Sequence, residues 1–162
     1  MADEHLATYL NDHLAGAVAA IEILEHLERA HAGTELERTL RELRADVEAD
    51  RRELDALMER LDVKASAPRR AAAWLTERVA RLKLRLDDPA GGALRLLESL
   101  EAVAVGIHGK LALWRALAAA AANAPRLRGV DYERLAQRAE NQRGRVEALR
   151  LEAAKDALGP AP

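Results

Sequence analysis

The apolar residues of this chain recur with helical spacing over four long segments, and this periodicity limits the fold more than any other feature. Such spacing places one stripe of each segment on one face of a helix. The segments cover residues 3–31, 34–61, 89–122 and 131–158. Strong helix formers (Ala, Leu, Arg and Glu) dominate the composition, and aromatic residues make up only 2% of it. We therefore expect an all-α protein.

The breaks between these segments carry helix start and stop signals. Residues 34–37 read Thr-Glu-Leu-Glu, a capping-box pattern, and Asp131 is a candidate N-cap. Residues 123–125, Asn-Ala-Pro, end the third long segment. A linker at 62–68 leads into a shorter amphipathic segment over 69–86, which we also expect to be helical.

The lengths of the segments predict how they pack. At a rise of 1.5 Å per residue, each long segment forms a helix of about 40 Å. Helices of similar length favour an antiparallel four-helix bundle in up-down-down-up order, with an extra crossover helix (69–86) between the second and third long helices. We expect residues 1–158 to form a single domain and residues 159–162 a disordered tail.

This arrangement resembles the ferritin-like fold. The stretches TYLNDHLAGAVAAIEILEHL (residues 8–27) and GIHGKLALWRAL (residues 106–117) also resemble a family of small uncharacterised bacterial helical proteins. The resemblance extends over nearly the whole chain. It implies a fold and carries no activity with it.

Composition excludes several functions. The chain has no cysteine, so disulfides, thiol catalysis and Cys-based zinc sites are excluded. The start MADEHLATYL lacks the features of a signal peptide, and we expect a cytoplasmic protein with no membrane span. The only serines, Ser66 and Ser99, lie in no nucleophile-elbow pattern, and no Gly-rich phosphate loop is present. We do not expect an enzyme.

Polar residues interrupt the apolar stripes near the middle of each long helix. Reflecting the helices through their turns brings most of these residues to about the same level, which predicts a central polar layer. The candidates for this layer or for a ligand site are His13, Asp50, Arg51, Glu101, His108, Gln142 and Arg143.

Three interpretations of this layer differ in chemistry. The first is a buried network of hydrogen bonds and ion pairs, because a buried charge must be paired. The second is an anion pocket formed by Arg51, Arg143 and His108. The third is a di-iron centre, but the layer is short of carboxylates, and the only Glu-x-x-His motif lies at the end of the first helix, from Glu28 to His31. We therefore expect no metal and no cofactor.

Two glycines, Gly106 and Gly109, lie in the third long segment, where each costs about 1 kcal/mol relative to alanine. They project opposite to the face that carries Leu94, Ala104 and Leu111. Glycines there allow another backbone to approach closely. We expect this neighbour to be the 69–86 helix or a second subunit.

The 69–86 segment is strongly basic. Residues 63–86 carry a net charge of +6, against −9 for residues 1–62. Its basic face, Arg78, Arg81, Lys83 and Arg85, could bind an anionic membrane surface or nucleic-acid phosphates. A simpler interpretation is that its apolar side packs on the bundle and its charge complements the acidic first hairpin. We therefore expect neither nucleic acid nor membrane as a partner.

These features favour a non-catalytic helical bundle that acts in protein interaction or assembly with an unknown protein partner, as a homodimer. Contact would be made by the Ala-rich end of the third long helix and by the glycine face. One alternative is a divergent ferritin-like protein that binds a metal or a small ligand in the polar layer. The other is binding of an anionic surface through the basic helix.

Overall fold

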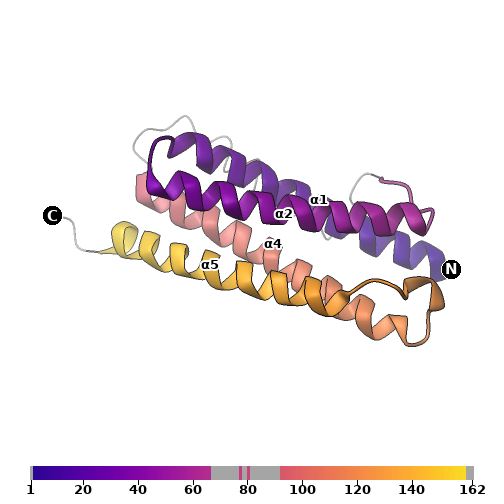
Figure 1. Ribbon diagram of the computed structural model, residues 1–162. Helices are drawn as coiled ribbons and strands as arrows, with labels where there is room; N and C mark the ends of the chain where they lie inside the picture. Colours follow the sequence, from indigo (N-terminus) through magenta and orange to yellow (C-terminus); the bar gives the residue numbers. More distant parts are fainter. Residues whose placement is uncertain (1, 67–76, 78–79, 81–91, 160–162) are drawn as a thin grey trace.

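The computed structural model describes residues 2–66, 77, 80 and 92–159, and four long α-helices account for most of them (Figure 1). The all-α, four-helix prediction is confirmed, and the described residues contain no strand. Of the predicted 69–86 helix, only Glu77 and Ala80 are described, and both are helical. The elements are α1 (Ala2–Ala30), α2 (Glu35–Arg60), α4 (Gly92–Ala121), the short 3₁₀ helix η2 (Pro125–Leu127) and α5 (Tyr132–Leu158).

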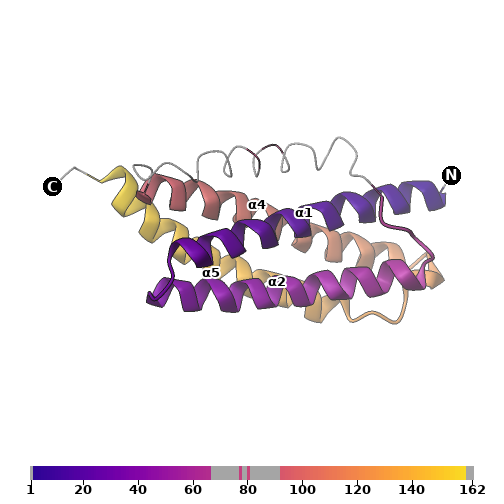
Figure 2. The same cartoon turned by 90° about the horizontal axis from the view of Figure 1, so that it is seen from above.

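The four helices pack as two hairpins, α1 with α2 and α4 with α5 (Figures 1 and 2). Helix α1 lies against α4, and α2 faces α5. Gly106 of α4 faces Ala20 of α1, and Gly109, further along α4, faces His13, which comes earlier in α1. Helices α1 and α4 therefore run in opposite directions. Because α1 is antiparallel to both α2 and α4, these last two helices run in the same direction, as Figure 1 also shows.

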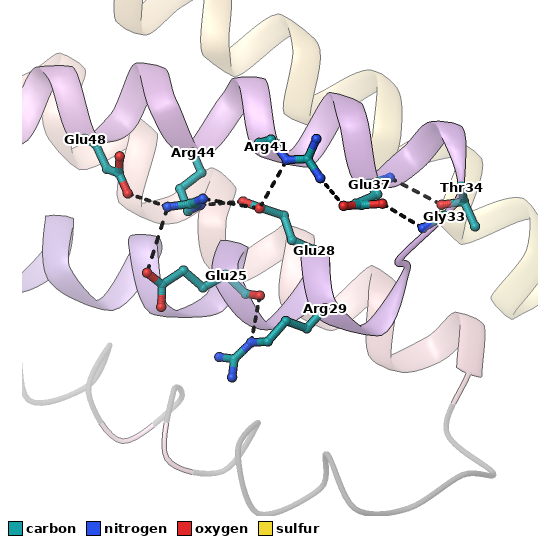
Figure 3. A network of polar contacts seen from close by, with 9 residues as sticks. All are labelled: Glu25, Glu28, Arg29, Gly33, Thr34, Glu37, Arg41, Arg44 and Glu48. Carbon is teal, nitrogen blue, oxygen red and sulfur yellow. Dashed lines mark hydrogen bonds and ion pairs between the residues drawn. The ribbon is translucent and has the colours of Figure 1, made fainter.

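The capping motif predicted at residues 34–37 is present (Figure 3). The Thr34 hydroxyl accepts a hydrogen bond from the backbone N–H of Glu37 (3.3 Å). The Glu37 carboxylate accepts one from the N–H of Gly33 (2.6 Å). Gly33 has a φ of +82°, which favours glycine, and it lies in the turn that joins α1 to α2.

Charged side chains join α1 to α2 beyond this turn (Figure 3). The Arg44 guanidinium donates to Glu28 of α1 (2.5 Å) and to Glu48 of its own helix (2.6 Å). Hydrogen bonding to Glu28 raises the pKa of Arg44. Glu28, half of the only Glu-x-x-His motif, is therefore engaged in an ion pair within the hairpin.

The α4–α5 hairpin is fixed by its own connection. Asp131 caps α5 as predicted, with its carboxylate accepting from the N–H of Arg134 (3.0 Å). The buried Tyr132 hydroxyl donates to the carbonyl of Leu127 (2.7 Å). Arg128 donates to the carbonyls of Ala121, the last residue of α4, and of Ala122, which follows it. These contacts satisfy helix-end groups that would otherwise lack partners.

Buried apolar residues form two clusters along the bundle. One lies toward the α1–α2 turn and includes Leu24, Leu40 and Val103. The other lies toward η2 and includes Leu10, Trp114 and Leu135. Asp50 of α2 and Gln142 of α5 lie between the two clusters along their helices.

Helix α4 is the described helix that bears on the expectation of no membrane span. Among the described residues, its length and composition alone would allow it to cross a membrane. In the structure one face of α4 packs in the core through residues such as Leu100, Val103 and Ile107. A core helix of a bundle meets the same criterion.

Candidate functional site

A buried carboxylate, that of Asp50, lies at the centre of the bundle and accepts hydrogen bonds from two other helices. Asp50 is only 1% exposed. Its Oδ2 accepts from Lys110 Nζ of α4 (2.5 Å) and from Gln142 Nε2 of α5 (2.7 Å). Its Oδ1 accepts from Arg138 Nε of α5 (2.5 Å). Lys110 also donates to the side-chain oxygen of Gln142.

This Asp50 cluster (Asp50, Lys110, Arg138 and Gln142) holds one carboxylate against two cations. Burial lowers the pKa of Lys110, and the charge of Asp50 acts in the opposite direction. Two residues of the predicted central layer, Asp50 and Gln142, belong to this cluster, and both are buried. Such a network fixes which helix faces point inward, since each polar group finds its partner in only one arrangement.

A cavity of about 240 Å³ lies beside the Asp50 cluster. Among the described residues, its walls come from residues 9–20 of α1, 47–54 of α2 and 105–114 of α4. The walls are mostly apolar. Small residues on both sides, Gly16 and Ala20 of α1 with Gly106 and Gly109 of α4, leave this space unfilled. For scale, an engineered apolar cavity of about 150 Å³ binds benzene.

Three side chains in the cavity wall carry buried polar atoms that have no hydrogen-bond partner within the protein. They are the indole Nε1 of Trp114, the guanidinium Nε of Arg51 and the carboxylate Oδ1 of Asp12. The Trp114 side chain is 1% exposed. A buried polar atom without a partner costs about 1–3 kcal/mol, and native proteins contain few of them. Three such side chains in the wall of one apolar cavity mark it as the candidate site.

The charged groups of the wall differ in how they are neutralised. Arg51 lies 3.5 Å from the Asp55 carboxylate, and Asp50 and Lys110 are paired with each other. Asp12 makes no ion pair or hydrogen bond with any described residue. Within the part of the chain that the structure describes, its negative charge therefore has no counter-charge.

His13, a predicted site residue, lies in the cavity wall. Its ring packs edge-on against Tyr9, with 4.6 Å between ring centroids. Burial lowers the pKa of His13, and the neighbouring charge of Asp12 opposes this effect. His13 is therefore neutral near pH 7 and contributes an aromatic surface to the wall.

The prediction is wrong for three other residues of the layer. His108 is exposed, and Arg143 is exposed and pairs with Glu140 of its own helix (2.8 Å). Glu101 lies 3.6 Å from Arg150, away from the Asp50 cluster. The inward face of α4 follows Val103, Ile107 and Trp114 and not the line through Leu94, which is 49% exposed. This change of phase turns His108 outward, so Arg51, Arg143 and His108 do not form an anion pocket.

The two glycines are close-packing residues, but their neighbour differs from the one expected. A Cβ at Gly106 would lie 3.5 Å from the Cβ of Ala20 and 4.0 Å from the carbonyl oxygen of Gly16. A Cβ at Gly109 would lie 4.0 Å from the ring of His13. The glycines thus face α1 of the same chain and not a second subunit.

Sequence reasoning missed Lys110, Arg138, Asp12 and Trp114. A signal existed for the first two. Lys110 lies three residues after buried Ile107, and Arg138 lies three residues after buried Leu135, so each shares the side of a core position. No sequence signal distinguished Asp12 from the other acidic residues of the first hairpin.

Two candidate sites remain, a metal site and the basic face of the 69–86 segment, and the described residues give no support for either. The described residues contain no group of three or more His, Cys, Asp or Glu side chains suited to a metal ion. The basic face (Arg78, Arg81, Lys83 and Arg85) lies outside the described residues.

Comparison with family models, curated proteins and solved structures gave no match. No family match therefore supports the resemblance carried by residues 8–27 and 106–117.

Proposed function

We propose that this protein binds a small organic molecule in the cavity between α1, α2 and α4. The observation that carries this proposal is the largely apolar cavity of about 240 Å³, whose walls include the side chain of Trp114. The indole N–H of Trp114 is buried and has no hydrogen-bond acceptor from the protein. Apolar walls with a few polar groups that converge on them are characteristic of small-molecule sites. A ligand with an apolar body and a polar group would fill this space.

The size of the cavity limits the ligand. Small-molecule pockets for drug-sized compounds span about 300–1,000 Å³, and this cavity is about 240 Å³. A single aromatic ring with a short polar side chain suits this volume. Such a ligand would bind by apolar contact, and the Asp50 cluster, which contributes Asp50 and Lys110 to the wall, would hold the helices in place.

The experiment is a calorimetric titration of the full chain with 2-phenylethanol. We expect saturable binding with a Kd on the order of 0.1–1 mM, given about nine heavy atoms. In Gly109→Leu the new side chain fills the cavity and abolishes binding. The matched control is Gly144→Leu, because Gly144 lies on α5 with open space around it. Absence of saturable binding to the wild type would contradict the proposal, as would equal binding by both variants.

Assembly through protein contact, as a homodimer, is the second candidate. Its support is a set of exposed leucines: Leu158 is 70% exposed, and Leu151 and Leu94 are also exposed. Apolar side chains on a surface favour an interface when they lie together. Light scattering of wild type and Leu151→Glu tests it: a dimer that the substitution converts to monomer supports assembly, and a wild-type monomer at all concentrations contradicts it.

The finer description of the fold is also a proposal. A ferritin-like bundle with residues 69–86 as a crossover helix is supported by the common direction of α2 and α4. The chain must travel back along the bundle between Arg60 and Gly92 to achieve that direction. A cytoplasmic location remains part of the same proposal. Amide exchange over 69–86 tests the helix, because a packed helix protects its N–H groups and an extended linker does not.

A further inference from the structure

Among the described residues of the cavity wall, the Asp12 carboxylate is the charged group that has no counter-charge. The other charged groups in the wall have counter-charges: Asp50 is held by Lys110 and Arg138, and Arg51 lies next to Asp55. Asp12 has no such partner among the described residues, and one of its oxygens is buried. A buried carboxylate oxygen is costly unless a donor or a cation reaches it.

The aromatic groups of the wall also favour a cationic ligand. Tyr9, His13 and Trp114 all line the cavity, and His13 packs against Tyr9. The faces of tyrosine and tryptophan rings attract organic cations. A carboxylate together with aromatic rings in an apolar space is a setting that suits an ammonium group attached to an apolar body.

We infer that the ligand of this cavity is a small amphipathic amine whose ammonium group is held by Asp12. The inference rests on the proposed function, since it names the chemical class of the same ligand. A carboxylate ligand would be repelled by Asp12, and a neutral ligand would leave the charge of Asp12 uncompensated.

The charge state of His13 gives this site a dependence on pH. The titratable groups of the wall are Asp12, His13 and Tyr9 on α1, Asp50 and Arg51 on α2, and Lys110 on α4. His13 is neutral near pH 7 because burial lowers its pKa. Once protonated, it places a positive charge beside Asp12 and competes with the ligand's ammonium group. Affinity for an amine should therefore fall in acid.

The test compares three probes of similar size and different charge by calorimetry on the full chain: 2-phenylethylamine, 2-phenylethanol and phenylacetate. We expect the amine to bind about tenfold more tightly than the alcohol at pH 7, and phenylacetate to bind most weakly. Asp12→Asn should remove the preference for the amine and leave the affinity for the alcohol unchanged. Glu59→Gln, which removes the same charge from an exposed position on α2, should retain the preference.

The possible outcomes separate the two proposals. If the alcohol binds as tightly as the amine, or if the preference persists in Asp12→Asn, the amine inference is overturned while ligand binding stands. If none of the three probes binds, the proposed function fails and the inference fails with it. The amine preference of wild type should shrink between pH 7 and pH 5, and in His13→Gln it should shrink less.

Discussion

The α1–α4 contact and the α2–α5 contact lie on opposite sides of the bundle and are built in opposite ways. Small residues line the first, where Gly106 faces Ala20 and Gly16. Long charged side chains span the second: Arg134 pairs with Glu53 (2.8 Å), and Arg145 pairs with Asp46 (2.6 Å). The first contact brings two backbones together, and the second joins two helices across a wider gap.

The difference shows where a four-helix bundle can leave room for a ligand. Arginine side chains fill the space between α2 and α5 with their own atoms and bury their carbon chains along the helices. Glycine has no side chain to fill the space next to a close contact, so the α1–α4 side leaves a cavity beside Gly109. The charged side holds the bundle together, and the small-residue side provides the candidate site.

The largest effect should come from the residue that joins the two sides, Asp50. In Asp50→Ala, Lys110 and Arg138 lose their carboxylate and remain in a mostly buried position. Breaking a buried ion pair in this way costs about 3–5 kcal/mol, and the free energy of unfolding measured in urea should fall by this amount. A loss below about 1 kcal/mol would show that the cluster contributes little to stability.

A substitution on the α1–α4 side should stabilise the protein, whereas Asp50→Ala destabilises it. Gly109→Ala removes an interior helix glycine and should raise the free energy of unfolding by about 1 kcal/mol, because the added methyl group has space beside His13. The control is Gly144→Ala, with the same gain in helix propensity on an open surface. Only Gly109→Ala should also weaken the binding of 2-phenylethanol. Loss of stability in Gly109→Ala would contradict the description of this side.

The exposed ion pairs of the α2–α5 side should matter less. Arg145 is partly exposed, and exposed pairs contribute about 0.2–1 kcal/mol. Arg145→Ala should lower the free energy of unfolding by that amount in dilute buffer, and the loss should diminish in 1 M salt because salt screens the pair. A loss that does not change with salt would indicate that packing of the arginine carbon chain, not charge, closes this side.

The smallest effect concerns His13 and depends on pH. Its pKa is lower in the folded protein than the ordinary value of about 6.5. The unfolded chain therefore takes up a proton at higher pH than the folded protein does, and stability declines as pH falls below that value. In unfolding measurements between pH 7 and pH 5, His13→Gln should decline less than wild type. The decline that remains in His13→Gln includes a contribution from His31, because burial also lowers the pKa of His31.

The burial of Asp50 and Gln142 could be predicted from the sequence. On α2 and α5 the apolar residues form a clear stripe, so the sequence shows which polar residues lie on the core face. Asp50 lies three residues after Val47 and four before Leu54, and Gln142 has the same relation to Ala139 and Val146. Both positions belong to a core face, and both side chains are buried as predicted.

Helix α4 could not be oriented in the same way, since alanine and leucine occur on most of its faces. The predicted inward face, set by Leu94, placed His108 in the core and Lys110 outside it. In the structure the core face of α4 follows Val103 and Ile107. One residue along a helix is a rotation of about 100°, so a small error in phase exchanges a buried side chain for an exposed one.

The cavity could not be predicted for a different reason. The cavity is the volume that the side chains of three packed helices leave unfilled. Helical periodicity shows which residues face the core, but it does not show how completely they fill it. The sequence indicated that Gly106 and Gly109 permit a close approach, but it did not indicate which helix approaches them. Only the packed structure shows Asp12, Arg51 and Trp114 around one space.

The most direct test observes the indole N–H of Trp114. The chain has two tryptophans, so Trp74→Phe leaves a single indole N–H resonance in a ¹⁵N-labelled sample. Titration with 2-phenylethylamine should move this resonance saturably, because the bound ligand lies in the cavity whose wall includes the Trp114 side chain. If the resonance stays in place while calorimetry shows the probe bound, the ligand lies elsewhere and the cavity is not the functional site.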